Sequence, residues 1–227
     1  MQAKELSIIY EKLRCCYGPQ HWWPGDTPFE VCIGAILTQN TAWQNVEKAI
    51  QNLKAAGKLD APSLRAIPEA ELANLIRPSG YYNTKAKKLK AFVTWLEQRC
   101  HDDLANLFQT ETASLRQELL DIYGIGEETA DSILLYAGYK PVFVVDAYTK
   151  RIFSRLGLIP PAKPYAEIQA IFMNNLPEDT PLFNEYHALI VRHGKETCRR
   201  QPRCRGCCLA RSDALNNTQN PYPCSLV

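Results

Sequence analysis

Residues 119–157 read LLDIYGIGEETADSILLYAGYKPVFVVDAYTKRIFSRLG, and this stretch carries most of the information about the fold. Gly124, Ile125 and Gly126 lie between one apolar helical segment and the start of another, so the glycines permit a tight turn with exposed backbone N–H groups. Such groups at the start of a helix favour an anion, for example a phosphate. The stretch therefore predicts a helix, a hairpin and a second helix, although a plain helix–helix turn also fits the glycines.

The hairpin is followed by an apolar run, Pro141 to Val145, which places Asp146 at the start of another helix. A carboxylate at that position can cap the backbone N–H groups of the helix. The same carboxylate could stabilise an oxocarbenium-like transition state and orient an attacking water, as carboxylates do when glycosidic bonds are cleaved. Taken alone, Asp146 is better explained as a helix cap.

Helical periodicity dominates the rest of the chain, and runs of β-branched residues are short. Prolines divide the sequence into segments of helix length, which predicts an all-α fold. We expect about ten helices, at residues 2–15, 28–38, 42–56, 69–76, 83–99, 112–121, 127–137, 146–156, 164–174 and 181–194.

Composition limits the class of protein. The chain has 227 residues, of which 46% are hydrophobic and 22% are charged, and no apolar run approaches the ~20 residues of a membrane span. The N-terminus lacks the apolar core of a secretory signal. We therefore expect a protein of the cytoplasm or, in a eukaryote, of the nucleus, without a membrane partner. A net charge of +2 does not by itself indicate nucleic-acid binding.

The stretch with the hairpin and Asp146 resembles the helix-hairpin-helix DNA glycosylases, the superfamily of endonuclease III, and the resemblance covers most of the chain. It extends to residues 37–41, LTQNT, which are similar to a helix end whose glutamine, here Gln39, reaches into the duplex beside a flipped base. The resemblance implies a two-lobed fold that binds double-stranded DNA containing a damaged base, as a monomer, with Asp146 in the cleft. The implied lobes are a central barrel, 28–145, and a second lobe made of 1–27 and 146–227. The implied DNA contacts are Gly124, Ile125, Gly126, Thr129 and Arg200.

One departure from the endonuclease III pattern concerns the chemistry. In the bifunctional members, the second residue after the last hairpin glycine is a lysine that forms a Schiff base with the sugar, and here this residue is Glu128. A carboxylate cannot form an imine, so we expect no strand cleavage by that route.

Several strings are most similar to the bacterial 3-methyladenine DNA glycosylases of endonuclease III type, including WWP at 22–24, RPSGYYN at 77–83 and HGK at 193–195. That likeness implies an aromatic base pocket, in which each ring can contribute ~0.5–2 kcal/mol of cation–π attraction to an alkylated purine. It also places Lys195 near the pocket, where it would orient Asp146 or contact DNA. Core packing and an ordinary surface lysine are the alternatives. The implied base-binding residues are Trp22, Trp23, Pro24 and Trp43, together with Gln39.

Five of the nine cysteines follow residue 197, among several arginines. Dense cysteines in a reducing compartment bind metal more often than they form disulfides, and C-x5-C-x2-C is a partial metal signature. The resemblance implies a 4Fe-4S cluster with the pattern C-x6-C-x2-C-x5-C, but Asp213 stands at the fourth position. Zinc on four thiolates, or no metal, are the alternatives. The expected ligands are Cys198, Cys204, Cys207 and Cys224, with Cys208 as a substitute.

Together these features predict a monofunctional DNA glycosylase that hydrolyses the N-glycosidic bond of a flipped base, with an alkylated purine such as 3-methyladenine as the expected lesion. Two alternatives remain open. One is an endonuclease III-like glycosylase for oxidised or mismatched bases, and the other is a non-catalytic DNA-binding iron–sulfur protein. The sequence does not fix the lesion, because one methyl group in a pocket is worth only ~1–3 kcal/mol.

Overall fold

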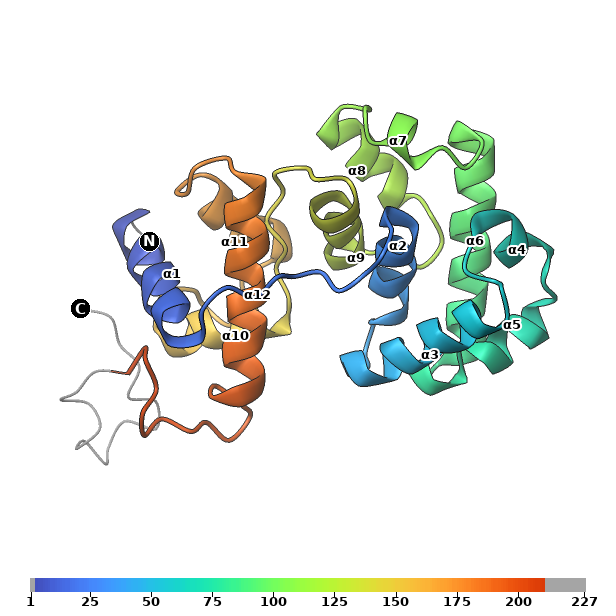
Figure 1. Ribbon diagram of the computed structural model, residues 1–227. Coiled ribbons are helices and arrows are strands. Elements are labelled where there is room, and N and C mark those ends of the chain that lie inside the picture. The colour runs from blue at the N-terminus through green and yellow to red at the C-terminus, as the bar shows by residue number, and fades with distance from the viewer. Residues whose placement is uncertain (1–2, 211–227) are drawn as a thin grey trace. The chain divides into compact units, whose positions relative to one another are not determined.

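The computed structural model describes residues 3–210, and within that range the secondary structure is entirely helical (Figure 1). The all-α prediction is therefore confirmed. The described residues contain no helix long and apolar enough to cross a membrane. The chain divides into two compact units, one of residues 23–140 and the other of residues 1–22 with 141–227.

The unit of residues 23–140 is built around α2, Pro28–Leu37. Thr27 caps this helix by accepting a hydrogen bond from the backbone N–H of Glu30, and Pro28 occupies the first turn, where a missing N–H costs nothing. Nearly all of α2 is buried, because it contacts α3, α6, α9 and η2. The helices of this unit besides α2 are α3 (Trp43–Ala55), α4 (Ala61–Ala66), α5 (Glu69–Leu75), η1 (Arg77–Ser79), α6 (Tyr82–Cys100), α7 (Leu104–Leu107), α8 (Thr112–Leu120), α9 (Glu127–Ser132) and η2 (Ile133–Ala137).

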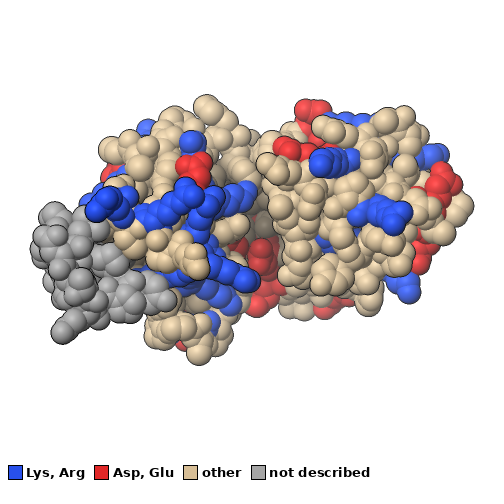
Figure 2. Space-filling view, turned by 90° about the horizontal axis from the view of Figure 1, so that it is seen from below, with Lys and Arg blue, Asp and Glu red and all other residues tan. Residues whose placement is uncertain are grey.

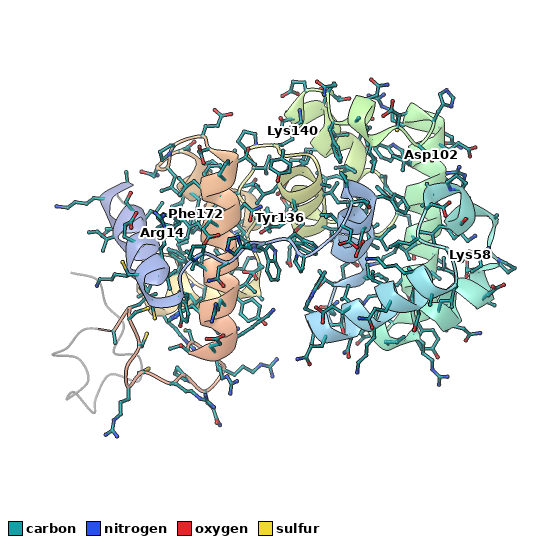
Figure 3. All side chains as sticks on the ribbon, viewed as in Figure 1. Arg14, Lys58, Asp102, Tyr136, Lys140 and Phe172 are labelled. Carbon is teal, nitrogen blue, oxygen red and sulfur yellow. The ribbon has the colours of Figure 1, made fainter. Side chains whose placement is uncertain are left out.

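The other unit contains α1 (Ala3–Tyr17), α10 (Ala147–Arg155), α11 (Tyr165–Met173) and α12 (Thr180–Glu196). Aromatic rings fill its core: Phe172, labelled in Figure 3, stacks on Phe143 with ring centroids 4.0 Å apart, and Phe153 and Tyr186 meet it edge-on. Each fully buried ring of this kind stabilises the fold by roughly 1.5–3 kcal/mol. This core fixes α12 against α10, the helix that begins after Asp146.

The hairpin predicted at Gly124 to Gly126 is present. α8 ends at Leu120, Gly124 adopts a left-handed φ of +81°, and α9 begins at Glu127. A buried ion pair fixes the two helices, with Arg116 Nε 2.7 Å from an oxygen of Asp131, a side chain that is completely buried. The segment 127–137, predicted as one helix, is α9 followed by the π-helical turn η2. The short helices α4 and α7 were not predicted, because six and four residues are too few to show a period.

Candidate active site and DNA-binding elements

Asp146 caps α10, as its position in the sequence predicts. Its Oδ1 accepts hydrogen bonds from the backbone N–H of Thr149 at 2.7 Å and from the Thr149 hydroxyl at 2.9 Å. Asp146 is only 8% exposed. Its second oxygen, Oδ2, lies 3.8 Å from Nε2 of His187. The carboxylate is thus held in one orientation by two donors on its own helix, and a buried imidazole lies beside its other oxygen.

His187 is the neighbour of Asp146 that the sequence patterns did not single out. It lies in α12 and is 5% exposed. Burial lowers the pKa of His187; the negative charge of Asp146 acts against that shift, and Lys195 reinforces it. The imidazole is therefore neutral at pH 7, because its pKa is below the ordinary 6.5. A lone histidine within an apolar helix face carries no functional signal in sequence, so only the fold reveals this contact.

Lys195 is exposed near the end of α12, and its Nζ lies 5.5 Å from the centroid of the Trp22 ring. Gly194, its neighbour in the HGK string, has a packing role. A Cβ at Gly194 would lie 2.3 Å from Cδ1 of Tyr148, so only glycine allows the Tyr148 ring to lie against α12. Asp146, Tyr148, Lys195 and Trp22 all belong to the same unit.

Trp23 belongs to the unit of residues 23–140, where it meets two other rings. Its ring centroid lies 5.1 Å from that of Trp43 and 5.0 Å from that of Tyr136. Gly34 faces this aromatic cluster, since a Cβ there would lie 3.3 Å from Nε1 of Trp23. Tyr136 was not predicted, because the π-helical turn that carries it leaves no mark in the hydrophobic period. Pro24 is exposed beside Trp23.

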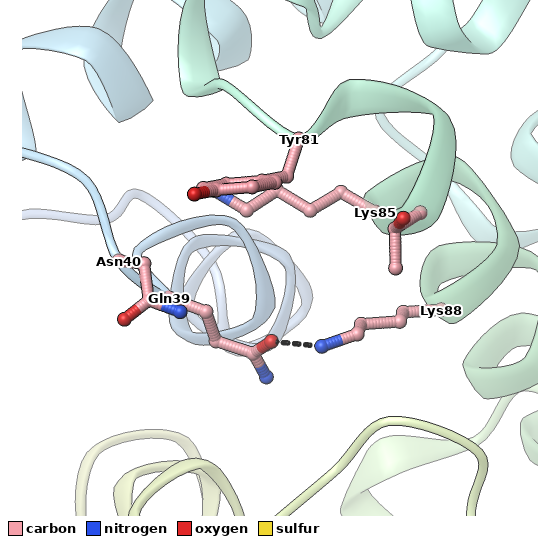
Figure 4. A pocket seen from close by; sticks show the side chains of 6 residues that line it. Gln39, Asn40, Tyr81, Lys85 and Lys88 are labelled. Atoms are coloured by element: carbon pink, nitrogen blue, oxygen red, sulfur yellow. Dashed lines mark hydrogen bonds between the residues drawn. The ribbon is translucent and has the colours of Figure 1, made fainter.

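Gln39 follows the end of α2 and links three elements. Its Nε2 donates to the backbone oxygen of Gly124 at 3.1 Å and to the hydroxyl of Thr129 at 2.9 Å. Its Oε1 accepts a hydrogen bond from Lys88 in α6, drawn as a dashed line in Figure 4. Among the other predicted hairpin contacts, Ile125 is buried at 5% exposure. Gly126 occupies the N-cap position of α9.

A small pocket of about 150 Å³ lies beside Gln39 (Figure 4). Tyr81 on its wall has an exposed fraction of 73% and a left-handed φ of +47°, unusual for an aromatic residue. Tyr81 belongs to the RPSGYYN string, which resembles the 3-methyladenine DNA glycosylases. The residues lining the pocket are Gln39, Asn40, Tyr81, Thr84, Lys85 and Lys88.

Basic side chains gather on the face of the N- and C-terminal unit shown in Figure 2. Arg155 ties the segment after α12 to α10, because its guanidinium donates to the backbone oxygens of Arg199 at 2.5 Å and Arg200 at 2.9 Å. Arg200 itself is exposed. The segment therefore presents charged side chains to solvent while its backbone is fixed.

Residues 33–178 match the family of HhH-GPD superfamily base excision DNA repair proteins. The chain belongs to this superfamily. The match spans the hairpin and Asp146, so the resemblance stated from the sequence is confirmed at the level of the superfamily.

Similar proteins extend the comparison. A protein of Methanocaldococcus jannaschii, named as a candidate DNA repair glycosylase, is 50% identical over 201 residues, which are 88% of this chain and 91% of that protein. The crystal structure of the Helicobacter pylori 3-methyladenine DNA glycosylase bound to 1,N6-ethenoadenine is 32% identical, with a TM-score of 0.72, and the match covers 86% of this chain and 98% of that one. A non-covalent endonuclease III–DNA complex shares the fold at 21% identity, with a TM-score of 0.78 and coverage of 91% and 92%.

The described cysteines of the C-terminal segment contact several different side chains. Sγ of Cys198 accepts a hydrogen bond from Arg155 at 3.3 Å, and Sγ of Cys207 lies 3.8 Å from His193. Burial raises the pKa of Cys208 to about 12, and Cys16 is its hydrogen-bond partner. Within residues 3–210 no three His, Cys, Asp or Glu side chains could hold a metal ion. Cys204 is half-buried in the same segment, and Cys224 lies outside the described residues. The described residues thus contain no assembled metal site, and both the iron–sulfur cluster and zinc stay predictions.

Proposed function

We propose that this base excision repair protein is a monofunctional DNA glycosylase that hydrolyses the N-glycosidic bond of an alkylated purine such as 3-methyladenine. The observation that carries the proposal is the arrangement of Asp146, a buried carboxylate whose Oδ1 is fixed by two hydrogen bonds at the start of α10. A charge held in place before the reaction loses little energy to reorganisation when positive charge develops on the sugar.

Asp146 would stabilise the oxocarbenium-like sugar as the bond to the base breaks, and it would orient the water that attacks C1′. The neutral imidazole of His187 would add no positive charge beside Oδ2 of Asp146. The products would be the free base and an abasic site. Glu128 in the first turn of α9 has no amine, so no Schiff base would form at that position.

The preference for an alkylated purine rests on aromatic rings. The faces of Trp23, Trp43 and Tyr136 would attract a purine that carries positive charge, with ~0.5–2 kcal/mol for each favourable ring. Trp22, with Lys195 above its ring, and Pro24 would add to base recognition. The Helicobacter pylori relative is a 3-methyladenine glycosylase that binds 1,N6-ethenoadenine, which supports a modified adenine as the substrate class.

The partner would be double-stranded DNA with one damaged base. The hairpin, Gly124 to Gly126, and Thr129 would bind a phosphate of the strand, and Arg200 would add a charged contact. Gln39 and the exposed ring of Tyr81 would enter the duplex where the flipped nucleotide leaves a gap. Extruding a damaged base costs a few kcal/mol, which such contacts must offset.

The test is excision by the purified full chain from duplexes that each contain a single lesion. We expect release of 3-methyladenine, with an abasic site that stays intact until alkali is added. Release of oxidised pyrimidines instead would support the endonuclease III-like alternative. That alternative is suggested by the similarity to the endonuclease III of Thermotoga maritima, which is 31% identical over 183 residues. Covalent trapping of the enzyme on DNA by borohydride through a lysine would refute the monofunctional assignment. DNA binding without excision of any lesion would support the alternative of a non-catalytic DNA-binding protein.

A further inference from the structure

Lys88 in α6 and Gln39 after the end of α2 are joined by a hydrogen bond. A carboxamide has two N–H donors and one carbonyl acceptor. All of these are used in Gln39: both donors go to the hairpin side, at Gly124 and Thr129, and the carbonyl accepts from Lys88. Gln39 can therefore leave this position only if Lys88 releases it.

The side chain of Lys88 crosses the hairpin on its way to Gln39. A Cβ placed on Gly124 would lie 2.5–2.6 Å from Cγ, Cδ and Cε of Lys88. The lysine stem thus lies directly against the glycine, in the space that any other residue would fill. Its ammonium ends beside the loop that the proposed function assigns to a DNA phosphate.

The other lysines of α6 are not equivalent to Lys88. Lys85 is 2% exposed, and its Nζ is committed to the backbone oxygens of Leu37 at 2.8 Å and Ser79 at 2.7 Å. Lys90 donates to the backbone oxygens of Arg65 and Ile67. Lys88 is half-buried and lines the pocket beside Gln39 (Figure 4).

We propose that Lys88 is a DNA-phosphate contact which, on binding the phosphodiester, releases Gln39 to enter the duplex. This inference rests on the proposed function, in which the hairpin binds the strand and Gln39 leaves its place. An ammonium has three donors, and a phosphate oxygen is a stronger partner for it than a neutral amide oxygen. Phosphate binding at the hairpin and the movement of Gln39 are then one linked event.

Lys88→Met tests the contact, because methionine keeps an unbranched stem over Gly124 and removes only the charge. We measure the affinity of the full-length protein for a duplex with one tetrahydrofuran abasic-site analogue over a range of salt concentrations. The slope of log K against log salt is expected to fall by about one in Lys88→Met. Lys87→Met, an exposed neighbour with the same loss of charge, is the matched control and is expected to leave the slope unchanged. Lys88→Arg should retain the wild-type slope.

The release of Gln39 is tested by combining Lys88→Met with Gln39→Ala. If DNA binding breaks the hydrogen bond between Lys88 and Gln39, the wild-type protein loses the free energy of that bond when it binds. Each single variant already lacks the bond and does not have this cost. The double variant should then bind about 2- to 10-fold more weakly than the product of the single effects predicts. Thermal melting of each free variant checks that it is folded.

Three results would overturn the inference: an unchanged slope in Lys88→Met, an equal fall in Lys87→Met, or strictly multiplicative effects in the double variant. If these occur while the wild-type protein binds the duplex and excises a lesion, only the role of Lys88 is refuted. If the wild-type protein neither binds this duplex nor excises any lesion, the proposed function fails as well.

Discussion

Replacing Asp146 by asparagine separates its structural role from its proposed chemical role. Asparagine and aspartate are about equally good helix caps, and an amide oxygen can accept the same two hydrogen bonds from Thr149. The change removes the negative charge at the positive end of α10, which is worth ~0.3–1 kcal/mol of stability. The Asp146→Asn protein should therefore fold, with a melting temperature only a few degrees lower.

The effect on excision should be much larger. Removing one fixed electrostatic group from a transition state costs ~2.7–4 kcal/mol, which corresponds to a 10²- to 10³-fold slower reaction. The assay is single-turnover release of the damaged base with enzyme in excess, so that the rate reports the chemical step and not product release. Affinity for the abasic-site duplex is measured in parallel and is expected to change little.

Asp179→Asn is a matched control for this experiment. Asp179 caps α12 in the same manner, accepting from the backbone N–H of Leu182 at 2.6 Å, and it is exposed. Its replacement should cost similar stability and leave excision unchanged. The reasoning about Asp146 is refuted if Asp146→Asn excises within about threefold of the wild-type rate, or if Asp179→Asn loses as much activity.

Three further predictions concern other residues. Trp43→Leu should slow excision of 3-methyladenine, a cation in DNA, about 2- to 30-fold more than excision of a neutral lesion such as hypoxanthine, and equal losses would argue against a cation–π contribution. Burial, with a smaller effect from Lys88, lowers the pKa of Lys85 from 10.5 to about 8. Between these two pH values the unfolded chain binds more protons than the folded chain, so the free energy of unfolding rises with pH in that window. Urea unfolding at pH 7 and pH 10 should show a gain of about 2 kcal/mol in the wild type relative to Lys85→Met, and parallel curves would contradict the shift. Anaerobically purified protein is expected to contain iron, which Cys198→Ser should lose and the exposed Cys15→Ser should keep; zinc or no metal in the wild type would reject the cluster.

The sequence by itself determined the features that depend on neighbouring residues. Gly124 permits the left-handed turn of the hairpin, and the residue type at Asp146 fixes a helix cap. Residue 128 is a glutamate, so the sequence alone shows that no lysine amine stands at this position. Turn chemistry, capping and residue identity act over a few positions, so a single sequence suffices to read them.

Only the tertiary structure decided which distant side chains meet. His187 reaches Asp146, Tyr136 joins Trp23, and Lys88 holds Gln39. These contacts depend on the packing of helices far apart in the chain, and no local period or spacing encodes them.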